Sequence, residues 1–242
     1  MQEGVIIKGI GGFYYVDTAV GVYECRARGK FRIKNITPLI GDRVKIEGDA
    51  GSLQGYIIEI LERKNQLVRP TVANIDLAII VFAARKPNIN NALMQRFLVY
   101  SEYKKLNAVV CINKIDLDKE GHYLDIVRML ETVPYKVIRT SAKTNVGIEQ
   151  LKEVLRDKVS VFAGPSGVGK STLLNCIQPG LGLKTGALSK KTGRGTHTTR
   201  YVELIKLEIG GMVADTPGFT SLDIDELEVS ELESCFPEFS NY

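Results

Sequence analysis

A glycine-rich segment that ends in lysine and serine has the clearest chemical meaning in this sequence. It reads Gly164-Pro165-Ser166-Gly167-Val168-Gly169-Lys170-Ser171. The spacing GxxxxGK[ST] is that of a phosphate-binding loop, whose glycines let backbone N–H groups surround a β-phosphate. Lys170 can reach the β- and γ-phosphates, and the Ser171 hydroxyl can ligate Mg²⁺. Because an apolar strand precedes the loop and a helix that includes Thr172 follows it, the segment predicts a nucleoside triphosphate site. The alternative is a glycine-rich turn with an exposed lysine.

A second motif addresses the base of that nucleotide. Asn113-Lys114-Ile115-Asp116 follows a buried strand expected over Ala108–Ile112. The Asp116 carboxylate can accept hydrogen bonds from N1 and N2 of guanine, a donor pair that adenine lacks. Ser141-Ala142-Lys143 comes 28 residues after Asn113 and again follows a strand, so that a backbone amide there could contact guanine O6. The pair of motifs predicts guanine recognition, whereas Asp116 alone could equally be a helix N-cap.

Two further segments could sense the γ-phosphate. Asp215-Thr216-Pro217-Gly218 is a DxxG motif, in which Asp215 can hold a Mg²⁺-bound water and the Gly218 amide can contact the γ-phosphate. Upstream, the loop 193–200 is rich in glycine and threonine, and one of its threonines could complete the coordination of Mg²⁺. Thr199 is preferred because it directly precedes Arg200 and the next expected strand, and Thr198 is the close alternative. Taken alone, the DxxG segment would be interpreted as a turn.

The residue that would activate the attacking water is not the usual one. Many GTPases place a glutamine directly after DxxG, but this chain has Phe219, whose apolar side chain cannot orient water. His197, in the same loop as Thr199, is the nearest substitute and could orient or deprotonate water. The catalytic candidates are therefore His197 and Thr199, with slow hydrolysis in the absence of a partner. The alternative is a loop histidine with no catalytic part.

The elements that must position these motifs fall into two classes. Residues 67–222 alternate apolar strands with amphipathic helices, which predicts an α/β domain with a parallel sheet and helices on both faces. The guanine motifs precede the phosphate-binding loop, the reverse of the order in most GTPases, so the predicted domain is circularly permuted. Residues 1–66 contain short segments rich in Val, Ile and Tyr, which predict a small all-β barrel of the oligonucleotide-binding (OB) type.

The predicted barrel carries a cluster of positive charge. Its members are Arg26, Arg28, Lys30, Arg32 and Lys34. Such a cluster suits RNA phosphates, although an exposed hairpin whose charges protect a sheet edge explains it equally well. Net charges of +2, +9 and −7 for residues 1–66, 67–222 and 223–242 suit a polyanionic partner for the body of the chain, although a solvated surface with a slight Lys/Arg excess explains them equally well.

Composition limits the remaining possibilities. The chain has 242 residues, of which 44% are hydrophobic and 25% charged, as in an ordinary globular protein. Its longest apolar run has eight residues, against the roughly 20 that a membrane helix needs. There is no secretory signal pattern, and the four cysteines lie far apart without a CxxC pair. We therefore expect a cytoplasmic protein with no membrane association and no zinc site formed by this chain alone.

Taken together, these motifs resemble the ribosome small-subunit-dependent GTPase A family (RsgA, also called YjeQ or YloQ). The resemblance covers essentially the whole chain: an OB-like N-terminus, the permuted order, GPSGVGKS followed by Thr172-Leu173-Leu174-Asn175, His197-Thr198-Thr199, DTPGF and Phe236-Pro237-Glu238-Phe239. It implies GTP hydrolysis stimulated by the small (30S) ribosomal subunit, a role in late maturation of that subunit, and rRNA contact through the barrel. It also implies a catalytic role for the loop histidine, here His197.

The family also carries a C-terminal zinc module with a Cys/His cluster. Residues 223–242 are expected to form a short acidic helix with a trailing segment, and they resemble the start of that module. Because Cys235 alone cannot make a four-ligand zinc site, either the chain is truncated or this member lacks the module. The expected cofactors are thus GTP or GDP and Mg²⁺, with zinc expected for the family only. We expect a monomer. Two other functions stay open: a nucleotide-gated RNA-binding protein with little turnover, and a small-molecule phosphotransferase that uses the same loop.

Overall fold

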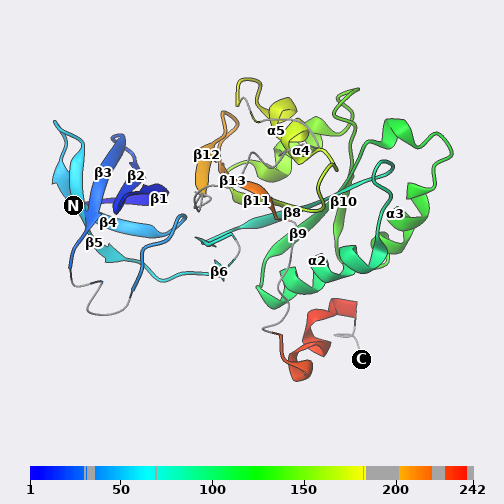
Figure 1. The fold of residues 1–242 in the computed structure, drawn as a ribbon, viewed down its shortest axis with the longest axis horizontal. Coiled ribbons are helices and arrows are strands. Elements are labelled where there is room, and N and C mark those ends of the chain that lie inside the picture. The colour runs from blue at the N-terminus through cyan, green and yellow to red at the C-terminus, as the bar shows by residue number, and fades with distance from the viewer. Residues whose placement is uncertain are drawn as a thin grey trace, which may run out of the picture.

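The computed structural model describes residues 1–29, 31, 36–68, 70–181, 183, 202–219 and 227–238, with the backbone alone for 215–219. Figure 1 shows a small β-structure at one end and a larger sheet flanked by helices at the other. The two are consecutive in the chain. The phosphate-binding loop and the guanine motifs all belong to the larger part.

Five strands close into the N-terminal barrel (Figure 1). They are β1 (Gln2–Ile10), β2 (Phe13–Thr18), β3 (Val22–Ala27), β4 (Arg43–Asp49) and β5 (Gln54–Ile60). Their order is β1-β2-β3-β5-β4, and β4 pairs back with β1. Only the β3–β5 pair among these is parallel. The interior is filled by apolar side chains such as Ile6, Tyr23 and Ile57, which are fully buried. The predicted OB-like barrel is therefore confirmed.

The larger sheet contains five parallel strands. In spatial order they are β10 (Lys136–Arg139), β9 (Asn107–Asn113), β8 (Leu77–Ala83), β11 (Val159–Ala163) and β13 (Met212–Phe219). A sixth strand, β12 (Glu203–Lys206), pairs antiparallel with β13. The prediction of a parallel sheet is correct for five strands and wrong for β12. The short turn that joins β12 to β13, closed by a bond from Leu207 N to Gly211 O of 3.0 Å, leaves no room for the crossover that parallel strands need.

Helices cover both faces of this sheet, as the alternating pattern predicts. On one face lie α2 (Asn91–Tyr103) and α3 (Tyr123–Glu131), and on the other lie α4 (Ile148–Leu155) and α5 (Lys170–Ile177). Strand β8 is buried along its whole length. Its side chains alternate, with Ile80 and Phe82 packing toward α2 and Ile79 and Val81 toward α4 and α5. A strand buried on both faces explains why its sequence is continuously apolar.

The remaining elements among the described residues are short. They are β6 (Gln66–Leu67), β7 (Val72–Ala73) and the 3₁₀ turns η1 (Ile115–Leu117), η2 (Val229–Glu231) and η3 (Glu233–Cys235). Near the C-terminus the sequence predicts a short acidic helix, and the described part of that segment instead forms η2 and η3. Cys235 in η3 is 3% exposed, and η3 packs against α2. The C-terminal segment therefore packs against the helix layer through η3.

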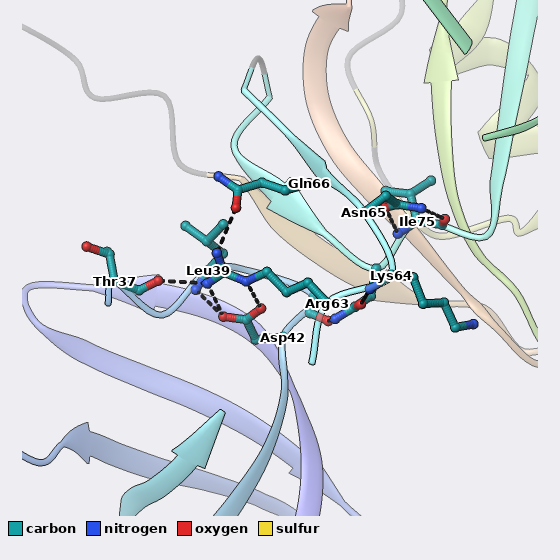
Figure 2. Close-up of polar contacts among 10 residues, drawn as sticks. Thr37, Leu39, Asp42, Arg63, Lys64, Asn65, Gln66 and Ile75 are labelled. Atoms are coloured by element: carbon teal, nitrogen blue, oxygen red, sulfur yellow. Dashed lines mark hydrogen bonds and ion pairs between the residues drawn. The ribbon is translucent and has the colours of Figure 1, made fainter. Parts of the chain in front are cut away.

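A polar network joins the barrel to the segment that leads from it toward the sheet (Figure 2). Its centre is Asp42, whose side chain is fully buried and receives two bonds from Arg63, from Nε at 2.7 Å and from Nη2 at 2.8 Å. Arg63 also donates to Thr37 O and Gln66 Oε1, at 2.8 and 2.7 Å. Because a planar guanidinium matches a carboxylate in only a few orientations, this contact fixes the chain where it leaves the barrel.

The barrel also contacts β12, the edge strand of the larger sheet that lies beside it (Figure 1). Strand β1 pairs with β12 at Lys8 and Glu203, and the Lys8 ammonium lies 3.0 Å from the Glu203 carboxylate. A second ion pair joins Lys206 to Asp17 at 2.6 Å. Barrel and sheet are therefore linked at two places.

Candidate functional site

The predicted motifs gather at one edge of the sheet. Because β8, β9, β10, β11 and β13 are parallel, the segments that leave their carboxyl ends lie along the same edge (Figure 1). Ligands of open α/β sheets bind at this edge. The guanine motifs follow β9 and β10, and the phosphate-binding loop follows β11. The structure thus brings together the motifs that the sequence predicts to act on one nucleotide.

Asn113 connects the base-reading motifs to the phosphate-binding loop. It is the last residue of β9 and is 1% exposed. Its Nδ2 donates to Val168 O at 2.9 Å, and its Oδ1 accepts from Thr140 Oγ1 at 3.1 Å and from Ala142 N at 3.4 Å. One buried amide therefore joins the end of β9 to two other segments, and so helps to hold this edge together.

Lys114 makes the second connection. Its backbone is left-handed, with φ of 60°. Its Nζ donates to Lys86 O at 2.6 Å and to Gly167 O at 2.5 Å. Burial lowers the pKa of this ammonium, and the charge of Asp116 opposes that effect. The lysine stem thus lies across the phosphate-binding loop, where it can form one wall of a base pocket.

Asp116 lies in the 3₁₀ turn η1 and is held by the second guanine motif. Ser141 Oγ donates to Asp116 Oδ1 at 2.6 Å. Ser141 is itself fully buried, and its N–H donates to Val146 O at 3.0 Å. The hydroxyl occupies one carboxylate oxygen and restricts the orientation of the group. A carboxylate held in this way is suited to accept from two donors on one edge of a base.

The phosphate-binding loop requires glycine at its turns. Gly164 has φ of +133°, and a Cβ there would lie 2.1 Å from Val81 O. Gly169 has φ of +102°, and its Cβ would lie 2.5 Å from Asn113 Nδ2. Any side chain at either position would collide with the neighbouring strand or with Asn113, so the loop can follow this path only with glycine there.

Lys170 is the first residue of α5. Its Nζ donates to Gly164 O at 2.7 Å and to Pro165 O at 2.8 Å. Burial lowers its pKa to about 8. The ammonium therefore lies inside the loop, where phosphate oxygens can replace the two carbonyl groups as its partners.

Several predicted site residues lie outside the described part of the chain. They are His197, Thr198, Thr199, Lys30, Arg32 and Lys34. Asp215 and Gly218 lie on β13, beside the strand that leads into the phosphate-binding loop, but only their backbone is described. Of the predicted RNA-binding cluster, Arg26 stacks on the Phe13 ring at 4.5 Å, and Arg28 is ion-paired with Glu47.

Sequence reasoning missed two contributors to this edge. Thr140 is fully buried and donates to Asn113, and the backbone carbonyl of Lys86 holds Lys114. Thr140 could have been found from its position directly before Ser141 at the end of a strand. The Lys86 contact leaves no signal in the sequence, because it depends on a carbonyl group.

Known proteins identify this arrangement. A family model described as RsgA GTPase matches residues 60–225, and one described as RsgA N-terminal domain matches residues 3–57. The chain belongs to the RsgA GTPase family. It is therefore a circularly permuted GTP hydrolase with an OB-like N-terminal domain, as the motifs predict.

Close relatives of this RsgA-family chain agree. A protein of Caldanaerobacter subterraneus subsp. tengcongensis named "Small ribosomal subunit biogenesis GTPase RsgA" is 53% identical over 240 residues, covering 99% of this chain and 81% of the relative. One of the same name from Alkaliphilus metalliredigens is 50% identical over 243 residues, covering 100% and 83%. Among solved structures, YjeQ from Thermotoga maritima is 39% identical with a TM-score of 0.86, covering 99% of this chain and 83% of that one. YloQ, described as a circularly permuted GTPase, is 40% identical with a TM-score of 0.83, covering 100% and 79%.

Membership of the RsgA GTPase family implies GTP or GDP and Mg²⁺, and the residues at this edge fit them. The glycines that have no room for a Cβ form a cradle, and Lys170 lies within it. Among the described residues, no group of three or more His, Cys, Asp or Glu could hold a metal ion without a nucleotide. A P-loop Mg²⁺ needs no such group, because nucleotide phosphates and a loop hydroxyl supply its ligands.

In the described part of the chain, none of the helices has the length and apolar character to cross a bilayer.

Proposed function

We propose that this chain hydrolyses GTP when it is bound to the small ribosomal subunit and that it acts in late maturation of that subunit. The observation that carries the proposal is the joining of the base-reading and phosphate-binding motifs by direct bonds, Asn113 to Val168 and Lys114 to Gly167. Relatives about half identical over the whole chain are named small ribosomal subunit biogenesis GTPases.

The proposed roles follow the geometry of the edge. Asp116 accepts from guanine N1 and N2, while Asn113 and Lys114 shape the pocket. The base is further supported by the second motif, Ser141, Ala142 and Lys143. The segment 164–172 surrounds the phosphates, and Lys170 neutralises the negative charge on their oxygens.

Hydrolysis involves the segments that sense the γ-phosphate. Mg²⁺, when bound, would be held by Ser171, Thr199 and Asp215 and would stabilise charge on the phosphates. We propose that the Gly218 amide contacts the γ-phosphate and that His197 orients the attacking water. Phe219 cannot perform that last task, which supports a low rate until the subunit arranges His197.

The partner proposal is more specific than the family name. We propose that the barrel contacts rRNA through Arg26, Arg28, Lys30, Arg32 and Lys34, and that the protein is a cytoplasmic monomer. Arg28 would have to exchange Glu47 for a phosphate. The proposed domains are 1–66, 67–222 and 223–242, the last being the start of the family's zinc module.

The test is steady-state hydrolysis of GTP and ATP with and without purified small subunits. Wild type is compared with Lys170→Ala and His197→Ala. We expect stimulation for GTP alone, with Lys170→Ala lowering the stimulated rate by about a hundredfold or more because it loses phosphate charge stabilisation. His197→Ala should lower the stimulated rate while leaving GDP affinity intact.

The result that contradicts the proposal is tight GTP binding with no response to subunits. That outcome would favour the nucleotide-gated RNA-binding protein, for which Phe219 is the supporting observation. Equal hydrolysis of ATP and GTP would instead contradict the roles given to the guanine motifs.

A further inference from the structure

Arg85 contacts the base-reading loop from a neighbouring strand. It lies two residues after the end of β8, and its Nε donates to Asp118 Oδ1 at 3.2 Å. The Asp118 side chain is 1% exposed and the Arg85 side chain 36%. The guanidinium therefore reaches inward from the surface to a buried carboxylate two residues beyond Asp116.

Asp118 is a buried carboxylate that connects Arg85 to the start of α3. Its Oδ2 accepts from the backbone N–H of Tyr123, the first residue of α3, at 2.9 Å. His122 and Glu120 also face the Arg85 guanidinium, at 2.9 and 3.4 Å, but their side chains are 60% and 73% exposed. Because exposed pairs contribute little, Asp118 is the partner that anchors Arg85.

The residue after Arg85 holds the same loop at a second point. Lys86 O accepts from Lys114 Nζ at 2.6 Å. Two consecutive residues of the β8 exit thus contact the loop at Lys114 and at Asp118, and Asp116 lies midway between those contacts in η1. The base-reading carboxylate is therefore carried on a short turn that is fixed at both ends.

We propose that Arg85 is a positioning residue for guanine recognition, acting through Asp118 to set the direction of the Asp116 carboxylate. This inference rests on the proposed function. Arg85 touches neither base nor phosphate. A carboxylate that accepts two hydrogen bonds from one base edge must lie in the plane of that edge, since hydrogen bonds weaken steeply when they bend. A carboxylate that accepts only one can turn without losing it.

This difference separates positioning from simple support of the fold. Guanine offers Asp116 two donors, N1–H and the 2-amino group, whereas hypoxanthine offers N1–H alone. If Arg85 sets the carboxylate direction, its loss weakens GDP more than inosine diphosphate. If Arg85 only stabilises the start of α3, its loss weakens both nucleotides by the same factor.

The experiment measures dissociation constants for GDP, inosine diphosphate and ADP with the full chain at neutral pH. The variants are Arg85→Ala, Arg85→Lys and Asp118→Asn. The matched control is Arg128→Ala, which removes an exposed ion pair with Asp125 in α3. Thermal midpoints are recorded for each variant.

We expect Arg85→Ala to weaken GDP by about tenfold, the equivalent of one charge-assisted hydrogen bond, and inosine diphosphate by about twofold. The preference for GDP then falls about fivefold. Asp118→Asn should reproduce the change, Arg85→Lys should restore part of the preference, and Arg128→Ala should leave it unchanged.

Two outcomes overturn the inference. One is an equal loss for both nucleotides in Arg85→Ala, and the other is no loss for either, provided that the wild type prefers GDP. A wild type that binds ADP as well as GDP would contradict the proposed function itself, and is thereby distinguishable from failure of the Arg85 role.

Discussion

The two ends of the nucleotide site are built differently. At the base-reading end, Ser141 donates a side-chain hydrogen bond to Asp116, and Asn113 bonds to the buried Thr140 and Val168. At the phosphate end, Lys170 bonds only to two carbonyl groups of its own loop among the contacts described. The base-reading side chains are thus fixed by contacts between distant segments, whereas the Lys170 ammonium is held by contacts within its own loop.

This difference suits the chemistry of each end. A base is distinguished by donor and acceptor directions, which require a rigid partner. A phosphate is recognised by charge and by backbone N–H groups, so the lysine need only exchange one set of oxygens for another. The more rigid end of the site is therefore the end that distinguishes one base from another.

The largest expected effect comes from changing the identity of the base-reading group. Asp116→Asn replaces an acceptor with an amide that can donate to the 2-oxo group of xanthine. We expect the ratio of GDP to xanthosine diphosphate affinity to fall by about a thousandfold. Competition binding with both nucleotides measures it. If the variant lost both nucleotides equally, Asp116 would support the loop and not read the base.

A second variant disturbs the contact between the phosphate-binding loop and Asn113 at the base-reading end. Gly169→Ala places a Cβ against Asn113 at a positive φ, and we expect nucleotide affinity to fall about a hundredfold. Gly167→Ala is the control, because φ is +80° there too but nothing lies within 4 Å of the added atom. Equal losses in both variants would show that backbone strain, and not the contact with Asn113, decides affinity.

The lowered pKa of Lys170 predicts that removing its charge stabilises the fold, although removing it also lowers the rate of hydrolysis. Its folded value of about 8 lies below the ordinary 10.5, so the buried ammonium destabilises the fold below pH 8. Between pH 8 and 10.5 the folded lysine loses its proton before the unfolded one, and that destabilisation fades. At pH 7 the free energy of unfolding of Lys170→Met should therefore exceed that of the wild type by about 1–2 kcal/mol, allowing for partial exposure. The variant should accordingly unfold at a higher denaturant concentration.

Denaturant unfolding in the absence of nucleotide, repeated at pH 7, 8.5 and 10, measures this difference. It should shrink as the pH rises. A difference that stays constant with pH would mean that packing of the methionine, and not the charge, causes it.

The smallest expected effect concerns Thr140, whose hydroxyl donates to Asn113. Thr140→Val keeps the shape of the side chain but removes the hydroxyl that donates to Asn113 and lies 3.3 Å from Cys111 Sγ. We expect a loss of about 1 kcal/mol in stability and a several-fold faster release of GDP. Thr144→Val is a suitable comparison, because Thr144 is exposed and contributes its backbone N–H to Ser141. Identical release rates in the two variants would remove Thr140 from the recognition network.

The sequence predicts the motifs of this site better than their supports. The segments 113–116, 141–143 and 164–171 could be found because each chemistry demands certain residue types at fixed spacing. Arg85 and Asp118 are 33 residues apart, and neither belongs to a spaced motif, so only the strand order β9-β8 reveals their contact. The antiparallel direction of β12 was missed for a related reason, since a four-residue strand carries no record of its direction.

The order of strands also has a consequence during synthesis. Strands β8, β9 and β10 come first in the chain and are neighbours in the sheet, so the base-reading edge can assemble before residue 159 has been made. Strand β11 then adds to the free side of β8, and β13 adds to β11. In the common order of GTPases the phosphate loop is made first. Here the nascent chain contains all of its base-reading residues before it contains the phosphate-binding loop.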